Sequence, residues 1–187
     1  MKIATWFNAR KAAQVTAFFV VRDGGSAPVL KLIKLIYLSN RKHIEKFNFP
    51  IFYDCLVSMP HGPVNSMTLN FIDGAFKDAG WDQFIGGRHG YDVTVTRTFD
   101  DDALDELSDA ELESLNEVWS ELGHMDRWVI RDYTHTHCPE WEDPNGSSTP
   151  IPYGRLLKHL RKQNVDDLDQ NIREEREIDE IFASLRE

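Results

Sequence analysis

The densest apolar stretch of this chain runs from Leu32 to Leu38, where apolar residues cover almost every side of a helix. A helix that is apolar nearly all round belongs in a protein interior, so we expect this one to be buried. Its sequence becomes polar after Leu38, and Pro50 ends it at the latest, because the residue before a proline avoids helical backbone. The pattern predicts a central helix that Pro28 opens and that runs to about Phe47.

Helical spacing of apolar residues recurs along the rest of the chain. Ser108 and Glu111 have the spacing of a capping box, in which each side chain bonds the backbone of the other at a helix start. Gly123 closes the helix that they begin. Pro63 is expected to open a helix, since proline is favoured in the first helical turn. The further predicted helices span residues 7–21, 63–79, 108–123 and 125–134, and another starts at Pro152.

One segment has the period of a strand. Residues 91–99 alternate between polar and apolar and are rich in β-branched side chains, which predicts a strand with one buried face. A strand must pair with another, and the extended stretch 55–59 is the expected partner. The glycines of residues 86–90 indicate a loop. The predicted fold is mainly α (α+β), a single-domain helical assembly with a minor two-stranded β element.

Length and composition fit one globular domain. The 187 residues are 41% hydrophobic and 11% aromatic, which suits a packed core and argues against general disorder. No apolar run approaches the ~20 residues needed to span a bilayer, and the first residues do not have the pattern of a signal peptide. Cys55 and Cys138 are far apart and suit free thiols. We therefore expect a cytoplasmic protein with no membrane partner.

Charge is unevenly distributed along the chain. The formal net charge is −10, and residues 98–126 contain Asp and Glu but no Lys or Arg. An acidic chain without a helix-turn-helix pattern is poorly matched to a phosphate backbone, so direct nucleic-acid binding is not expected. The acidic block suits attraction to a basic protein partner, or it is simply a solvated helix face. The sequence leaves both interpretations open.

Four short motifs follow one another along residues 9–162. They are Lys31-Leu32-Ile33-Lys34-Leu35-Ile36-Tyr37-Leu38, then His61-Gly62-Pro63-Val64, then Leu115-Asn116-Glu117-Val118 with Thr134-His135 and Pro139-Glu140-Trp141, and finally Ile151-Pro152 with Leu156-Leu157. None is specific alone, but in this order and spacing they resemble the Panacea domain of the SocA-like antitoxin family, found in bacterial and phage toxin–antitoxin pairs. The resemblance implies these motif residues: Lys34, Leu35, Tyr37, Leu38, His61, Gly62, Pro63, Val64, Thr134, His135 and Trp141.

The resemblance also implies a function. A member of this family is expected to be an antitoxin that neutralises a cognate toxin by direct protein–protein binding, without turnover and without a cofactor. The negative charge of the chain suits a basic toxin. One branch of the family acts instead as a proteolytic adaptor that delivers its toxin to a protease. Residues 1–165 would form the Panacea domain and residues 166–187 a C-terminal helical extension.

Most motif residues are expected to be structural. In His61-Gly62-Pro63, the glycine permits a tight turn and the proline fixes φ, so a backbone role is favoured over contact with a partner. Tyr37 is expected at the edge of the core and Lys34 in solvent.

The residues leave one enzymatic alternative, a metal- or thiol-dependent hydrolase from a phage or mobile element. His135, His137, Cys138 and Glu140 lie within six residues and are all zinc-ligand types. A structural zinc site would need a further pair of ligands, which folding would have to bring from Cys55 and His61. A cysteine hydrolase would need one of the thiols beside a histidine and an orienting acid. We expect neither a metal site nor catalytic residues.

The last predicted helix, residues 166–187, has only a thin apolar stripe among many charges. A helix of this kind buries little against its own domain and could lie in a partner's groove. The predicted partner-binding residues are Ile178, Ile181, Phe182 and Leu185. Packing of the same stripe on the domain's own core is the open alternative.

Overall fold

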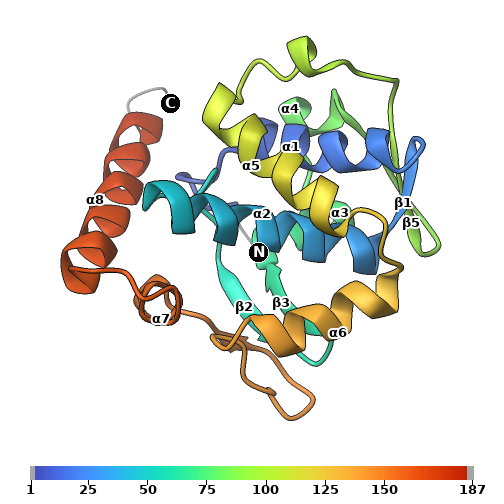
Figure 1. The fold of residues 1–187 in the computed structure, drawn as a ribbon. Coiled ribbons are helices and arrows are strands. Elements are labelled where there is room, and N and C mark those ends of the chain that lie inside the picture. Colours follow the sequence, from blue (N-terminus) through green and yellow to red (C-terminus); the bar gives the residue numbers. More distant parts are fainter. Residues whose placement is uncertain (1–2, 185–187) are drawn as a thin grey trace.

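The computed structural model describes residues 3–184, and side chains as far as Ile181. Its centre is α2 (Val29–Phe47), the expected buried helix, which packs against α1 (Ala9–Arg22), α5 (Asp109–Leu122), α6 (Arg127–His137) and α7 (Tyr153–His159). Figure 1 shows α2 crossing the middle of the molecule, with α5 and α6 on neighbouring sides. The prediction of a mainly α fold is confirmed.

Local sequence signals explain where these helices start. The capping box predicted at Ser108 and Glu111 is present at the start of α5, with both of its hydrogen bonds formed. Asn8 and Asp126 cap α1 and α6 by accepting hydrogen bonds from backbone N–H groups of the first turn. Pro28 is the N-cap residue of α2, as expected, and Asn48 ends that helix with φ at 71° in the left-handed region.

The β structure is larger than predicted and is paired differently. Two three-stranded antiparallel sheets replace the single two-stranded element. One has the order β1 (Ser26–Pro28), β5 (Asp92–Val95), β4 (Ile85–His89), and the other has the order β3 (Gly62–Asn65), β2 (Leu56–Met59), β6 (Thr149–Pro150).

Three expectations about these strands were wrong. The predicted strand at 91–99 does not pair with residues 55–59, because β5 lies between β1 and β4 and β2 forms a hairpin with β3. The glycine-rich segment expected to be a loop forms β4, where a register shift between Ile85 and Gly87 accommodates the glycines. Pro63 lies in β3, at an edge of its sheet where a missing N–H is tolerated, and the helix that it was expected to open, α3 (Ser66–Ile72), starts three residues later.

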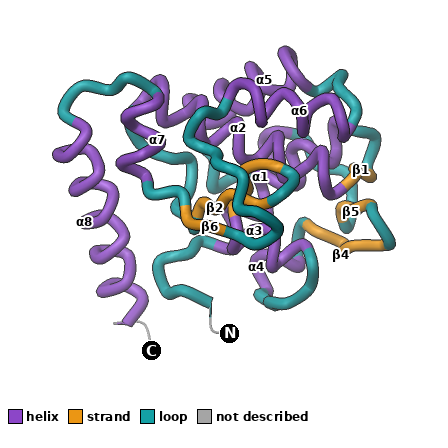
Figure 2. Tube along the Cα trace, turned by 90° about the horizontal axis from the view of Figure 1, so that it is seen from below, coloured by secondary structure: helices purple, strands orange, loops and turns teal. Residues whose placement is uncertain are grey.

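Short elements complete the fold. The 3₁₀ helix η1 (Asp101–Ala103) and the one-turn helix α4 (Ala79–Asp82) connect the longer elements, and α8 (Val165–Ser184) ends the described chain. Figure 2 shows α8 along one side of the molecule, where it packs mainly on α7. No helix within residues 3–184 is both long and apolar enough to cross a membrane. The domain boundary placed after residue 165 stays a prediction.

Carboxylates of the acidic block, residues 98–126, form ion pairs with basic side chains of the protein itself. Five basic residues of α1 and α2 pair with carboxylates of η1, α5 and the segment between them: Arg10 with Asp105 and Glu106, Lys11 with Glu111, Arg22 with Asp101, Lys42 with Glu117 and Glu121, and Lys46 with Glu113 and Glu117. Several of these carboxylates stay largely exposed, at 62% for Asp105 and 58% for Glu113, but they are paired within the fold and so are not a free surface for a basic partner. The basic-toxin expectation stays a prediction, and most of this block no longer supports it.

Candidate functional site

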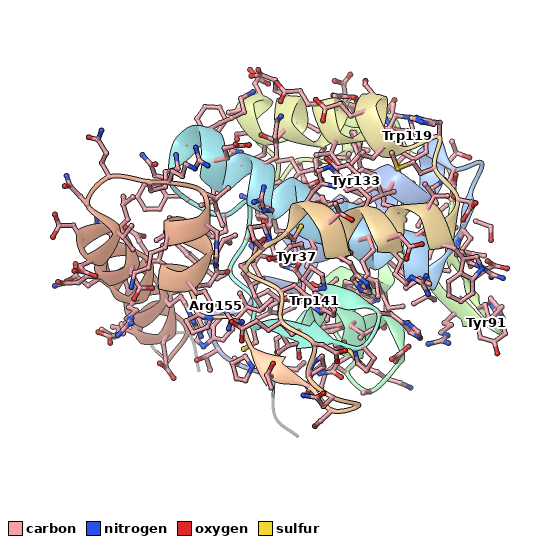
Figure 3. The ribbon with its side chains drawn as sticks, turned by 60° about the horizontal axis from the view of Figure 1, so that its bottom comes forward. Tyr37, Tyr91, Trp119, Tyr133, Trp141 and Arg155 are labelled. Atoms are coloured by element: carbon pink, nitrogen blue, oxygen red, sulfur yellow. The ribbon has the colours of Figure 1, made fainter. Side chains whose placement is uncertain are left out.

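The sequence motifs converge on the turn between β2 and β3. Lys34 and Tyr37 come from α2, Gly62 and Pro63 from β3, and Thr134-His135 from the end of α6. Figure 3 shows Tyr37 beneath α6 and Trp141 beside the β2–β3 hairpin. Segments about 30 and 100 residues apart in the sequence thus meet at one place, which we call the hairpin site.

Gly62 allows the β2–β3 turn to pack closely against α6 and α2. Its φ of +95° is a conformation that other residues rarely adopt. A Cβ atom added here would lie 2.6 Å from Thr134 Oγ1 and 3.2 Å from Lys34 Nζ. Any side chain would therefore push the turn away from α6 and α2, so the backbone role expected for this glycine has a direct steric cause.

Lys34 is fully buried, at 0% exposure, and not in solvent as the sequence suggested. Its Nζ donates a hydrogen bond of 2.9 Å to the carbonyl oxygen of Pro63, which fixes the second strand of the hairpin to α2. It forms no ion pair with any side chain that the structure describes. Burial lowers the pKa of Lys34 to about 7, because a charge without a counter-ion is costly in the interior.

A buried carboxylate holds the middle of α2. Glu140 Oε1 accepts hydrogen bonds of 2.8 Å from both the Tyr37 hydroxyl and the Arg41 Nε. Tyr37 is fully buried and not at the core edge, because this hydroxyl has an acceptor inside the protein. Burial, and then the charge of Glu140, raise the pKa of Tyr37 well above its usual value. The sequence reasoning missed this cluster, although Tyr37 and Arg41 lie one helical turn apart and so share a face.

Trp141 and His135 complete the hairpin site. Their rings are stacked with centroids 4.1 Å apart, and Trp141 Nε1 donates a hydrogen bond of 2.9 Å to the carbonyl oxygen of Met59. Thr134 is buried and donates to the carbonyl oxygen of Arg131 within its own helix. Of the remaining motif residues, Leu35, Leu38 and Val64 lie in the core, whereas His61 is exposed. In these contacts the motif residues form the frame that joins α2, the hairpin and α6.

The histidine-rich end of α6 does not assemble a metal site. His137 stacks on Tyr133, while His135 faces Trp141. The proposed additional ligands lie at opposite ends of β2, with Cys55 before it and His61 after it. Within the part of the chain that the structure describes, no group of three or more His, Cys, Asp or Glu side chains could hold a metal ion.

Neither thiol has the environment of a nucleophile. Burial raises the pKa of Cys55, and burial followed by the charge of Glu140 raises that of Cys138 to about 12. Catalytic cysteines need the opposite shift, since the thiolate is the reactive form. These environments therefore give no support to the thiol-hydrolase alternative.

The predicted partner-binding stripe lies in the second half of α8. The first half of this helix packs on the protein, with Ile172 buried and Arg176 placed over the Trp6 ring at 3.9 Å. Ile178 and Ile181 are 43% and 58% exposed. Leu185 and the side chain of Phe182 lie outside the described residues. Whether this end of α8 binds a partner stays a prediction.

Lys34 should make stability depend on pH. Between pH 7 and 10 the unfolded chain keeps a proton on this lysine that the folded protein has released, so the free energy of unfolding should rise with pH. From pH 7 to 8.5 the gain should be about 1.5 kcal/mol. The change Lys34→Met should remove this rise, which urea titrations of both proteins across that range would measure. If the free energy of unfolding changed with pH in the same way for both proteins, Lys34 would not be the cause of the rise.

Comparison with protein families gives one match. The model of the family described as "Antitoxin SocA-like, Panacea domain" matches residues 32–142, more than half of the chain. Comparisons with curated proteins and with solved structures give no match. The matched region contains most of α2, both strands of the β2–β3 hairpin, α6 and Trp141, and so includes the whole hairpin site. The chain therefore belongs to the SocA-like antitoxin family with the Panacea domain.

Proposed function

We propose that this protein is an antitoxin that neutralises a cognate toxin by binding it directly. The observation that carries the proposal is the family match over residues 32–142, which takes in the central helix and the frame around it. The proposed mechanism is occlusion or distortion of the toxin's active site, with no turnover. The unactivated thiols, and the lack of a metal-binding cluster among residues 3–181, fit a protein that acts by binding.

The proposed place of action is the cytoplasm. The two cysteines are unpaired, and Cys138 is buried within the core, as expected for a protein that folds in a reducing compartment.

Co-expression with the protein encoded beside it tests the proposal. The neighbouring protein alone should arrest growth, and expression of this chain should restore growth and give a complex that elutes as one peak from a sizing column. An unrelated protein of similar size, expressed from the same promoter, serves as the control. Continued arrest without a complex would contradict the antitoxin function.

The abundance of the toxin separates a neutraliser from a proteolytic adaptor. A neutraliser should leave the toxin at full level and bound in the complex. An adaptor should lower the toxin level, and rescue should then be lost in a host that lacks the responsible protease. Immunoblots of the toxin during rescue distinguish the two mechanisms.

A further inference from the structure

A pocket of about 900 Å³ opens beside the hairpin site. It is lined by the first turns of α2 and α6, the β2–β3 turn, the β4–β5 turn around Tyr91, and the loop at residues 146–148. Much of its wall is aliphatic, including Val29, Ile33, Met59 and Val64. The same frame that the motif residues build therefore forms one wall of a largely apolar recess.

Two aromatic side chains at this pocket are left in solvent. Trp128 in the first turn of α6 is 47% exposed, and Tyr91 in the β4–β5 turn is 75% exposed. Figure 3 shows Tyr91 at the periphery of the molecule. Exposed Trp and Tyr beside an apolar recess are typical of protein interfaces, because they contribute large contact areas with few rotatable bonds.

The pocket is lined by basic side chains and no acidic ones, in a protein with a net charge of −10. Lys34, Arg88, Arg127 and His61 line it, and none of its lining residues is Asp or Glu. Arg88 is paired with Asp73 outside the pocket. Lys34 is buried without a carboxylate among the described residues, and Arg127 lies over the Trp128 ring at 5.4 Å. The exposed cations of α1 and α2 pair within the fold, Arg88 is paired with Asp73, and Lys34 is bonded to the Pro63 carbonyl in the interior. Arg127 therefore keeps its charge available for an incoming anion.

We propose that this pocket binds an acidic segment of the partner protein, with an apolar side chain in the recess and a carboxylate directed at Arg127. The inference rests on the proposed function, since that partner is the toxin. A protein segment suits the site better than a small molecule because the exposed Trp128 and Tyr91 extend the apolar surface beyond the recess. The partner can be basic overall and still carry such a segment.

Two surface variants test the pocket without disturbing the core. Trp128→Ala should weaken binding of the purified neighbouring protein by roughly thirtyfold, as expected for an interface anchor, and Arg127→Glu by at least tenfold. The matched controls are Phe49→Ala and Arg97→Glu, which change an exposed aromatic and an exposed arginine outside the pocket. Isothermal titration gives the affinities, and melting temperatures should stay nearly constant in all four variants.

The outcomes separate this inference from the function on which it rests. If the wild-type protein does not bind its neighbour, the proposed function fails and the inference with it. If the wild-type protein binds and both pocket variants bind as tightly as their controls, the inference alone is overturned.

Charge exchange tests the chemistry of the segment. Reversing one Asp or Glu of the partner to Arg should restore binding to Arg127→Glu while weakening binding to the wild-type protein. If no single reversal restores binding, the proposal that the pocket binds an acidic segment is wrong. If inorganic phosphate or a simple dicarboxylate at millimolar concentration raises the melting temperature of the wild-type protein but not of Arg127→Glu, the pocket takes small anions, and a protein segment is the wrong occupant.

Discussion

Leu35→Asp is expected to yield no stably folded protein. Leu35 lies in the middle of α2, is 1% exposed, and faces a core shared with helices from both halves of the chain. An aspartate there would place an unpaired charge in the interior, at a cost of several kcal/mol or more. A domain of this size has a total stability of about 5–15 kcal/mol, so one such change takes a large part of it.

Solubility, circular dichroism and urea titration measure the effect of Leu35→Asp. Ile178→Asp is the matched control, because it introduces the same charge at a half-exposed helical position. The control should unfold cooperatively with nearly the stability of the wild-type protein. A Leu35→Asp protein that did the same would show that α2 is not the core of the fold.

Glu140→Ala is expected to destabilise the protein by about 3–5 kcal/mol, because removal of one partner leaves a buried charge uncompensated. The change would leave Arg41 without its carboxylate and the buried Tyr37 hydroxyl without its acceptor. Glu140→Gln should cost less, since the amide oxygen can still accept from Tyr37.

A second carboxylate two residues away provides the control for Glu140. Glu142 also pairs with an arginine, Arg155, at 3.0 Å, but its side chain is 70% exposed. Glu142→Ala should therefore cost less than about 1 kcal/mol. Urea titrations of the three variants give the comparison, and equal losses for Glu140→Ala and Glu142→Ala would show that burial of the Glu140 cluster contributes nothing.

The helices could be predicted because their signals are local. The apolar run of α2, the capping box of α5 and the glycine after that helix are all contained within a few residues. The pairing of the β-strands could not be predicted. Each strand has only a few residues, and the packing of distant elements determines which strand it pairs with. Pro63 illustrates the conflict: locally it suits a first helical turn, but the carbonyl oxygen of this residue is needed by Lys34 from α2.

The candidate site could be predicted in its members but not in its arrangement. The motif order identified Lys34, Gly62 and Thr134 from the sequence, and only the fold shows that they nearly touch. Lys34 was expected in solvent because lysine usually lies there. The pocket left no sequence signal at all, since Arg88 lies in β4, Tyr91 in the β4–β5 turn and Arg127 at the start of α6, and these positions carry no common pattern.

The ion pairs between α1, α2 and the acidic segment also affect the chain before it folds. Arg22 and Asp101, like Lys11 and Glu111, are about 80 to 100 residues apart in sequence. Opposite charge blocks attract each other in the denatured ensemble, over distances set by the Debye length. At low ionic strength the unfolded chain should thus be compact and biased toward the native topology, which lowers the entropic penalty of closing these long loops. Added salt should then lower the folding rate constant by a larger factor than it lowers the equilibrium constant of folding.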